Sequence, residues 1–171
     1  MNVDPANPDK EDRKKIVERR FKEISLEYAN KIPSFDIVNE SATFYNRGRK
    51  FLFEEYDEFG LKMGGKYFPN NRKIINETNG AIWHDYVTHG KYMAFNMQLK
   101  ELLQKGLQID EIGLQYHIFV KAEDLTDPLV HSKFLNATNM VEILDIYNKF
   151  NLPMHISYNG ELELRGECVV S

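Results

Sequence analysis

Four short apolar segments recur along this chain at nearly even intervals. They start near residues 35, 73, 112 and 154, so successive starts lie 38 to 42 residues apart. Between these segments, apolar residues recur at steps of three to five, which is the spacing of one face of a helix. Strands that alternate with helices in this way predict βαβ units, and therefore an α/β fold with a parallel sheet.

The pattern also predicts where the elements begin and end. The expected strands cover residues 35–38, 73–75, 111–118 and 154–157, and the expected helices cover 10–30, 44–59, 91–105 and 139–150. Pro33 ends the first helix, because its ring lacks a hydrogen-bond donor and restricts the preceding residue. Gly60, Gly64 and Gly65 are expected to lead from the second helix to the next strand. The apolar side of the third helix carries Tyr92, Phe95, Leu99, Leu102 and Leu103.

Composition limits the classes of protein to consider. With 42% hydrophobic and 12% aromatic residues the chain can bury a core, which we expect as one domain over residues 10–160, between a flexible leader (1–9) and a C-terminal tail (161–171). A net charge of −4, from 22 basic and 26 acidic residues, argues against nucleic-acid binding. We expect no membrane span or secretory signal, because no apolar run is long enough. The single cysteine, Cys168, rules out an internal disulfide and a cysteine-based zinc site.

Each expected strand is apolar at its start and polar at its carboxyl end. In parallel α/β folds, binding and catalytic residues lie where the carboxyl ends of the strands point. Polar residues at strand ends also simply mark the start of loops, but here they follow all four strands and include an Asn-Glu pair twice. The ends are predicted to bring Asn39, Glu40, Asn76, Glu77, Gln115, His117, Ser157 and Tyr158 to one rim.

Glu40 is the first candidate for chemistry. It follows an apolar strand, and partial desolvation there is expected to raise the pKa of its carboxyl toward that of a general acid, although a solvated rim glutamate fits the spacing equally well. Asn39 beside it can donate and accept hydrogen bonds, as a sugar hydroxyl requires. Gln115 and His117 alternate onto the same face of their strand, which favours a role facing the site.

The loop that contains Trp83, His84, Tyr86 and His89 invites a comparison with metal sites. The His-x4-His spacing does not match the helical spacing that places two imidazoles on one turn, and no cysteine lies nearby, so we expect no metal. Trp83 and Tyr86 fit stacking on a sugar ring as well as capping a barrel. The pair Gly64-Gly65 does not form a phosphate-binding loop, because neither glycine-rich consensus is present.

Four segments in order resemble the catalytic domain of family 10 glycoside hydrolases, the endo-1,4-β-xylanase family. Residues 35–40 (FDIVNE) resemble its WDVVNE motif at the fourth strand, and residues 109–117 (IDEIGLQYH) resemble its PIDGIGLQxH segment. Residues 74–79 (IINETN) are similar to its NDYN segment, and residues 152–157 (LPMHIS) to its LPIHITE segment. The order and the intervals agree over residues 11–158.

The resemblance implies a (β/α)8 TIM barrel that hydrolyses β-1,4-xylan with retention, using two glutamates and no metal or organic cofactor. Glu40 matches the acid/base residue and Asn39 its sugar-binding neighbour. Asn76 matches an asparagine of the fifth strand, and His117 matches the histidine that positions the nucleophile. Members of the family are usually secreted.

The chain departs from the family in two ways. Tyr158 stands where the family has the nucleophilic glutamate, and a phenol is a poor nucleophile unless a base activates it; Glu161 or Glu77 are the alternative sources of a carboxylate. A complete barrel takes about 250 residues, whereas this chain matches only about four parallel βα units, strands 4 to 7 of a partial barrel.

We therefore expect a xylanase-like chain that alone hydrolyses xylan weakly or not at all. A non-catalytic carbohydrate-binding module, in which Trp83 also contacts the sugar, and a structural half-barrel remain alternatives. In each case the open sheet is expected to leave two unpaired edges and an exposed apolar inner face, through which copies could associate.

Overall fold

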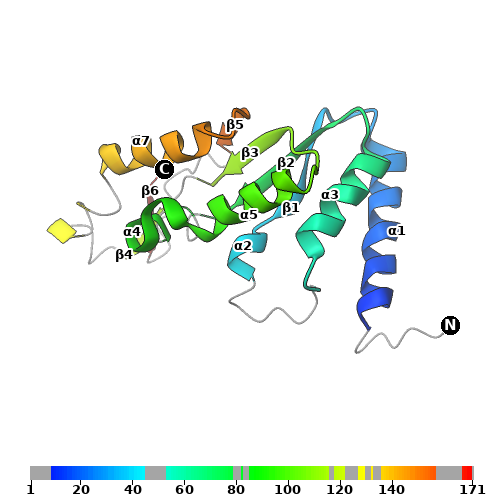
Figure 1. Ribbon diagram of the computed structural model, residues 1–171, viewed down its shortest axis with the longest axis horizontal. Coiled ribbons are helices and arrows are strands. Elements are labelled where there is room, and N and C mark those ends of the chain that lie inside the picture. The colour runs from blue at the N-terminus through cyan, green and yellow to red at the C-terminus, as the bar shows by residue number, and fades with distance from the viewer. Residues whose placement is uncertain are drawn as a thin grey trace.

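The computed structural model describes residues 9–44, 53–78, 82, 85–115, 118–121, 127–129, 132, 136–156 and 167–170. Its elements in chain order are α1 (Lys10–Tyr28), β1 (Ser34–Asn39), α2 (Ser41–Phe44), α3 (Tyr56–Tyr67), β2 (Arg72–Glu77), α4 (Asp85–His89), the 3-10 helix η3 (Gly90–Tyr92), α5 (Ala94–Gln104), β3 (Glu111–Leu114), β4 (Ile118–Lys121), α7 (Ala137–Asn148), β5 (Met154–Ile156) and β6 (Glu167–Val170). Four strands form a parallel sheet in the order β1-β2-β3-β5 (Figure 1). The predicted parallel α/β architecture is confirmed.

One row of residues crosses this sheet close to the carboxyl ends of its strands. Asn39, Asn76, Gly113 and His155 are Cα partners in successive neighbouring strands. Because all four strands run in the same direction, the residues around this row gather at one edge of the sheet. This is the edge at which the sequence places the site.

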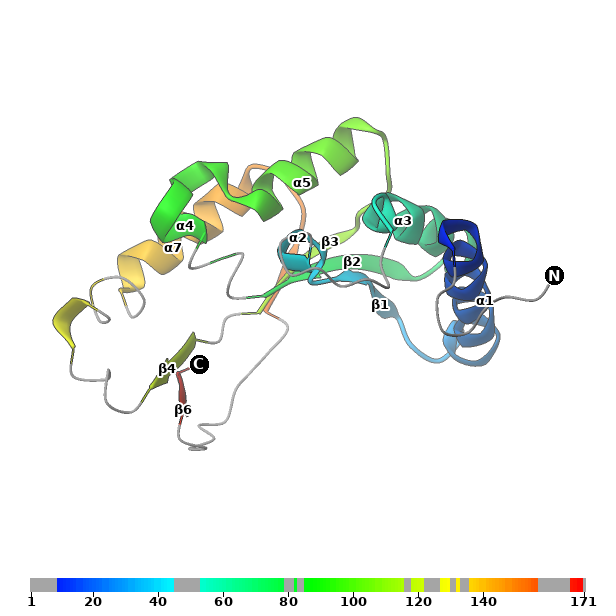
Figure 2. The ribbon, with the colours of Figure 1, turned by 90° about the horizontal axis from the view of Figure 1, so that it is seen from below.

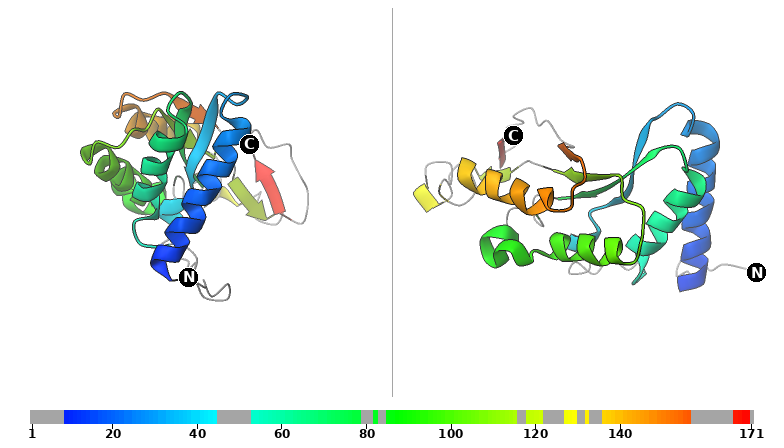
Figure 3. Two further views of the ribbon diagram at one scale, coloured as in Figure 1. Left: turned by 90° about the vertical axis from the view of Figure 1, so that its right-hand side faces the viewer. Right: turned by 45° about the horizontal axis from the view of Figure 1, so that its top comes forward.

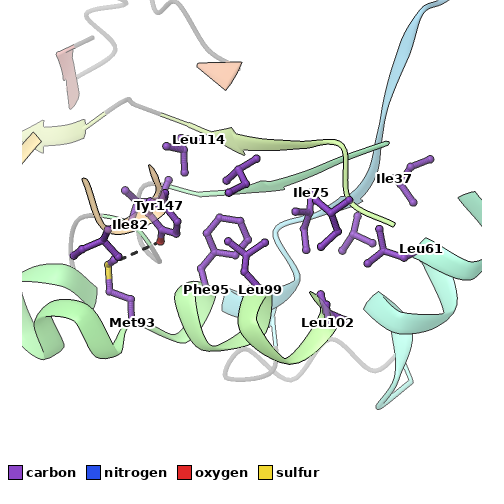
Figure 4. Close-up of a cluster of buried hydrophobic side chains, with 14 of the residues drawn as sticks. Ile37, Leu61, Ile75, Ile82, Met93, Phe95, Leu99, Leu102, Leu114 and Tyr147 are labelled. Carbon is purple, nitrogen blue, oxygen red and sulfur yellow. Dashed lines mark hydrogen bonds between the residues drawn. The ribbon is translucent and has the colours of Figure 1, made fainter. Parts of the chain in front are cut away.

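Helices α3, α5 and α7 lie over one face of the sheet (Figure 2). Between sheet and helices is a core of buried apolar side chains from both layers (Figure 4), which includes Ile37, Ile75, Ile112 and Leu114 from the strands and Leu61, Phe95, Leu99, Leu102, Ile143 and Tyr147 from the helices. Helix α1 has no fully buried residue. It packs against α3 and the residue that follows it: the partly buried Phe21 ring lies 6.1 Å, centroid to centroid, from the buried Phe68 ring, and the Glu18 carboxylate accepts hydrogen bonds from Lys66 and Tyr67.

The opposite face of the sheet is polar, which corrects the expectation of an apolar inner face. Side chains alternate along a strand, so the residues beside the core positions point away from the helices. In β1 the register shifts between Asp36 and Val38, so that Ile37 and Val38 both lie in the core and the residues on either side of them point away. Asp36, Asn39 and His155 on this face are exposed, and Arg72 is paired with Glu111. The apolar Ile74 also lies on this face and is buried, with 4% exposure. The strand pattern is therefore apolar toward the helices and hydrogen-bonding toward the other side.

The second expected helix, 44–59, is wrong in its position. The described residues place a short helix, α2, directly after Glu40 and a longer one, α3, over 56–67, so the glycines at 60, 64 and 65 lie inside a helix. A Cβ at Gly60 would lie 3.1 Å from Val38 Cγ2, and one at Gly64 would lie 3.0 Å from Ile37 Cγ2. These two glycines let α3 approach β1 closely, which outweighs their low helix propensity.

The other helices begin and end within a few residues of their expected bounds. In the third expected helix, Tyr92 was expected on the apolar side, but it is 66% exposed because it belongs to η3 and not to α5. Phe95, Leu99 and Leu102 are buried as expected. Among the helices of the described ranges, none has the length and hydropathy needed to cross a membrane.

The third expected strand, 111–118, is also wrong in its length. Strand β3 ends at Leu114, and Ile118 begins β4, which pairs antiparallel with β6 in a separate two-stranded sheet (Figure 3). Part of the expected C-terminal tail, Glu167–Val170, is therefore a strand. The run from 111 to 118 looked continuous because residues of high β propensity stand on both sides of the point where the main sheet ends.

At the other end of the sheet, a buried lysine ties β2 to β3. The Lys73 side chain has 0% exposure, and its Nζ donates to the Asn71 carbonyl at 2.7 Å and to Asp110 Oδ2 at 3.5 Å. The same carboxylate accepts the Lys73 N–H at 2.9 Å and a Gln108 amide at 2.9 Å. Burial alone would raise the pKa of Asp110, but these hydrogen bonds and the Lys73 charge hold it below its usual value.

Candidate active site

The carboxyl ends of β1 and β2 are joined by two hydrogen bonds. The Asn76 amide Nδ2 donates to Asn39 Oδ1 at 2.7 Å, and the Glu40 N–H donates to the Asn76 carbonyl at 2.8 Å. Asn76 is buried, whereas Asn39 is exposed on the open face. The bond thus fixes Asn39 in one orientation and leaves its amide at the surface of the rim.

Glu40 lies between these strands and the end of β3. Its side chain is half-buried, and Oε1 accepts a hydrogen bond from Gln115 Nε2 at 3.1 Å; the same Nε2 lies 3.4 Å from Asn39 Oδ1. The Gln115 N–H is itself bound to the Glu77 carbonyl at 3.1 Å. The structure therefore brings together four predicted site residues, namely Asn39, Glu40, Asn76 and Gln115. A carboxyl group at such a rim is the group that general acid–base chemistry on a hydroxyl or ether oxygen requires.

The Glu40 backbone has an unusual conformation. Its φ is +55°, in the left-handed region that residues with a Cβ rarely adopt. Such a conformation costs on the order of 1–3 kcal/mol and persists only where neighbouring contacts determine it. It turns the chain from β1 directly into α2, so that the Glu40 side chain leaves the strand at the rim.

Gly113 is a site residue that the sequence reasoning missed. It is paired with Asn76 in the register, and a Cβ built there would lie 2.5 Å from Asn76 Oδ1 and 2.9 Å from Asn76 Cβ. Only the absence of a side chain at this position lets Asn76 occupy the space in which it reaches Asn39. A glycine in the middle of an apolar strand was the available signal, since glycine in a strand indicates close approach of another group.

Glu77 does not face the site, although it belonged to the predicted rim and was considered as a second carboxylate. Its side chain has 0% exposure, and its two oxygens accept the backbone N–H groups of Ala42 and Thr78, each at 2.8 Å. It lies two residues after the core residue Ile75, so it shares the helix-covered face and not the open face with Asn76.

His155 and Asp36 add charge to the open face beyond the predicted residues. Both side chains are exposed there, on the outermost strands β5 and β1. Loss of water around Asp36 raises the pKa of its carboxyl, and the His155 charge opposes that shift. The sequence signal for both was alternation along the strand: His155 follows Met154, and Asp36 precedes Ile37, so each points to the face opposite its apolar neighbour.

The remaining predicted site residues, Trp83, His84, His117, Ser157, Tyr158 and Glu161, lie outside the described residues. Tyr86 and His89, which were expected in a loop, lie in helix α4. The His89 ring nitrogen Nδ1 lies 2.8 Å from Asp85 Oδ1, and a hydrogen bond from Tyr86 to Glu142 raises the pKa of Tyr86 to about 12. No group of three or more His, Cys, Asp or Glu side chains able to hold a metal ion occurs in the part of the chain that the structure describes.

A parallel βα sheet with its polar site at the carboxyl ends of the strands is the arrangement of (β/α)8-barrel enzymes, of which this chain has a part. The sequence model of glycosyl hydrolase family 10 matches residues 2–158, so the chain belongs to this family and the resemblance seen in the sequence is confirmed.

Among curated relatives, endo-1,4-beta-xylanase 2 of Aureobasidium pullulans is 28% identical over 162 residues. This match covers 88% of the chain and 40% of that relative. Endo-1,4-beta-xylanase A of Caldicellulosiruptor saccharolyticus is 22% identical over 152 residues, which cover 83% of the chain and 40% of that relative. The chain thus spans less than half the length of these relatives.

The fold agrees with solved structures over a similar share. A mutant structure in complex with xylotriose matches with a TM-score of 0.65 at 20% identity, covering 96% of this chain and 48% of that one. Xylanase XynB from Paenibacillus barcinonensis, complexed with a conduramine derivative, matches with a TM-score of 0.64 at 16% identity, covering 90% and 44%. The chain therefore has the fold of about half of a (β/α)8 barrel.

Proposed function

We propose that this chain binds a β-1,4-linked polysaccharide of the xylan type at the rim formed by β1, β2 and β3, with Glu40 as the acid/base carboxyl. The observation that carries the proposal is the convergence of Asn39, Glu40, Asn76 and Gln115 at that rim, joined by the hydrogen bonds described above. Family membership and the xylanase relatives support the same substrate class.

In this function the groups of the rim have separate roles. The protonated Glu40 carboxyl donates to the glycosidic oxygen as the bond to the anomeric carbon breaks, and its carboxylate can then take a proton from an attacking hydroxyl or water. Asn39, oriented by Asn76, binds a sugar hydroxyl. Gln115 holds the Glu40 carboxyl in place by donating a hydrogen bond from its Nε2 to Glu40 Oε1.

Retaining hydrolysis requires a second carboxylate about 5–5.5 Å from the first. The resemblance of residues 152–157 to the family's LPIHITE segment puts Tyr158 in that position, and a phenol with a pKa of about 10 attacks poorly without a base. Glu77 cannot replace it, because both its oxygens are bound to backbone amides on the other face. We therefore propose that the chain on its own binds the polysaccharide and hydrolyses it weakly or not at all.

The test is a calorimetric titration of the chain with xylohexaose, combined with a reducing-sugar assay. We expect saturable binding, weakened in Glu40→Gln and Asn39→Ala, and a rate close to the buffer background. A matched control is Glu101→Gln, an exposed helix carboxylate that leaves the rim untouched. A robust hydrolysis rate that Glu40→Gln abolishes would contradict the proposal that the chain alone is inactive. The absence of any xylohexaose binding would contradict the proposed polysaccharide-binding function.

Self-association is a second proposal, which the sheet order favours. Strands β1 and β5 are the outermost strands of the described sheet, and an edge strand offers unpaired N–H and C=O groups to a second copy. Multi-angle light scattering at several concentrations decides it. A mass near 20.1 kDa at every concentration contradicts self-association, and a concentration-dependent dimer supports it.

A further inference from the structure

Glu77 is a buried carboxyl group to which the proposed chemistry gives no role. Its carboxylate is fully buried beside the apolar core, and placing a charge there is costly unless hydrogen bonds compensate it. The Ala42 and Thr78 N–H groups provide that compensation at 2.8 Å each. Hydrogen bonds to an ionised acceptor are about twice as strong as neutral ones, so this contact firmly fixes the two amides.

The Ala42 contact acts on the backbone that follows Glu40. Ala42 is the second residue of α2, and its N–H is one that a helix start leaves without an internal partner. Two residues earlier, the left-handed Glu40 donates its own N–H to the Asn76 carbonyl. Two adjacent residues of β2 therefore hold the strained segment: Asn76 binds the N–H of Glu40 itself, and Glu77 binds the N–H of Ala42, two residues later.

Glu77 also reaches the Glu40 carboxyl from the opposite direction. Its carbonyl accepts the Gln115 N–H at 3.1 Å, and the Gln115 side chain donates to Glu40 Oε1 at 3.1 Å. One residue therefore contacts both segments that determine where Glu40 points, α2 through its side chain and the end of β3 through its main chain.

We propose that Glu77 is a positioning residue whose buried carboxylate anchors the start of α2 and thereby sets the backbone conformation and side-chain direction of Glu40. The inference rests on the proposed role of Glu40, but its structural part concerns the geometry of Glu40 alone. It gives a physical reason for an ionisable residue at a position where the core would otherwise favour an apolar one.

The test compares Glu77→Gln with Glu111→Gln. Both variants neutralise a buried glutamate of the same sheet, and Glu111 pairs with Arg72 at the other end of the strands, remote from α2. Glutamine offers one oxygen where two amides need an acceptor, so its NH2 group faces one of the two N–H donors. We expect Glu77→Gln to move the Ala42 amide signal and the Glu40 backbone and side-chain carboxyl signals in NMR spectra recorded at one pH. We further expect it to raise the Kd for xylohexaose by about tenfold or more.

Glu111→Gln should change stability but leave the Ala42 and Glu40 signals and the Kd unchanged. If Glu77→Gln folds and these readouts match the wild type, or if both variants move them equally, the positioning role is refuted. If Glu77→Gln does not fold, Glu77→Asp decides instead. It keeps the charge and the Thr78 bond but is too short for Ala42, so unchanged Glu40 and Ala42 signals would refute the role. A wild-type chain that fails to bind xylohexaose refutes the proposed function only, because the NMR readouts need no sugar.

Discussion

At the scale of single residues, the site depends on small steric and electrostatic details. Alternation along the strands and the polar strand ends predicted that Asn39, Glu40, Asn76 and Gln115 meet, and they do. The opposite orientation of Glu77 and the space left by Gly113 were not predicted. The orientation of Glu77 follows from its alternation with Ile75 and was overlooked. The space left by Gly113 depends on its pairing with Asn76, 37 residues away in the sequence, for which a single sequence gives no register.

Gly113→Ala should disturb the site through Asn76. The new Cβ would overlap Asn76 Oδ1, so the Asn76 amide must leave Asn39, and overpacking of this kind costs about 1–3 kcal/mol of unfolding free energy. Urea denaturation and xylohexaose titration measure the two effects. In an Asn76→Gly background the same substitution should cost far less, because both the clashing amide and its Cβ are gone; equal costs in both backgrounds contradict this explanation.

Asp36 and Asp110 should shift the pH dependence of stability in opposite directions. The folded-state pKa of Asp36 is raised, so its contribution is fully present below the unfolded value near 3.8 and is lost as pH rises through the folded value. That of Asp110 is lowered, so its contribution is present above 3.8 and is lost as pH falls. Urea denaturation at pH 7 and pH 3 is the measurement. Asp36→Asn should stabilise the chain at pH 7, Asp110→Asn should destabilise it there, and both differences should shrink at pH 3.

At the scale of elements, the sequence pattern predicted the four parallel strands because each is a short apolar run bounded by polar residues or glycine. It failed where long-range packing decides. Glycines in α3 read as a loop, since their low helix propensity is visible locally and their contact with Ile37 and Val38 is not. The pairing of β4 with β6 joins segments 46 or more residues apart, and nothing in either segment alone indicates its partner.

Two neighbouring glycines of α3 should therefore respond oppositely to alanine. Gly64→Ala places a Cβ 3.0 Å from Ile37 Cγ2 and should destabilise the chain by about 1–3 kcal/mol as α3 is pushed from β1. Gly65→Ala meets no atom within 4 Å and should stabilise it by up to about 1 kcal/mol through helix propensity. Thermal unfolding of the two variants measures the pair, and a stabilising Gly64→Ala would show that α3 does not need this close contact.

At the scale of the whole molecule, one layer of helices covers one face of an open sheet. The family assignment, the four-stranded topology and the length of the match all describe part of a barrel. The sequence predicted this extent because its four motifs match consecutive strands. The sequence did not predict that the open face is polar. Alternation along a strand separates its residues into two sets, but it does not say which set faces the helices until the strand register is known.

The polar open face has a thermodynamic consequence. Unfolding exposes apolar surface mainly from the helix-covered side of the sheet, because Asp36, Asn39 and His155 on the other side are already exposed to water. Newly exposed apolar surface raises the heat capacity of unfolding, and here mainly one side of the sheet supplies it, so scanning calorimetry should give less than the usual value of roughly 12–15 cal/mol/K per residue. The stability curve of this chain should accordingly be broad and shallow, with resistance to cold that a two-sided core of the same length would lack.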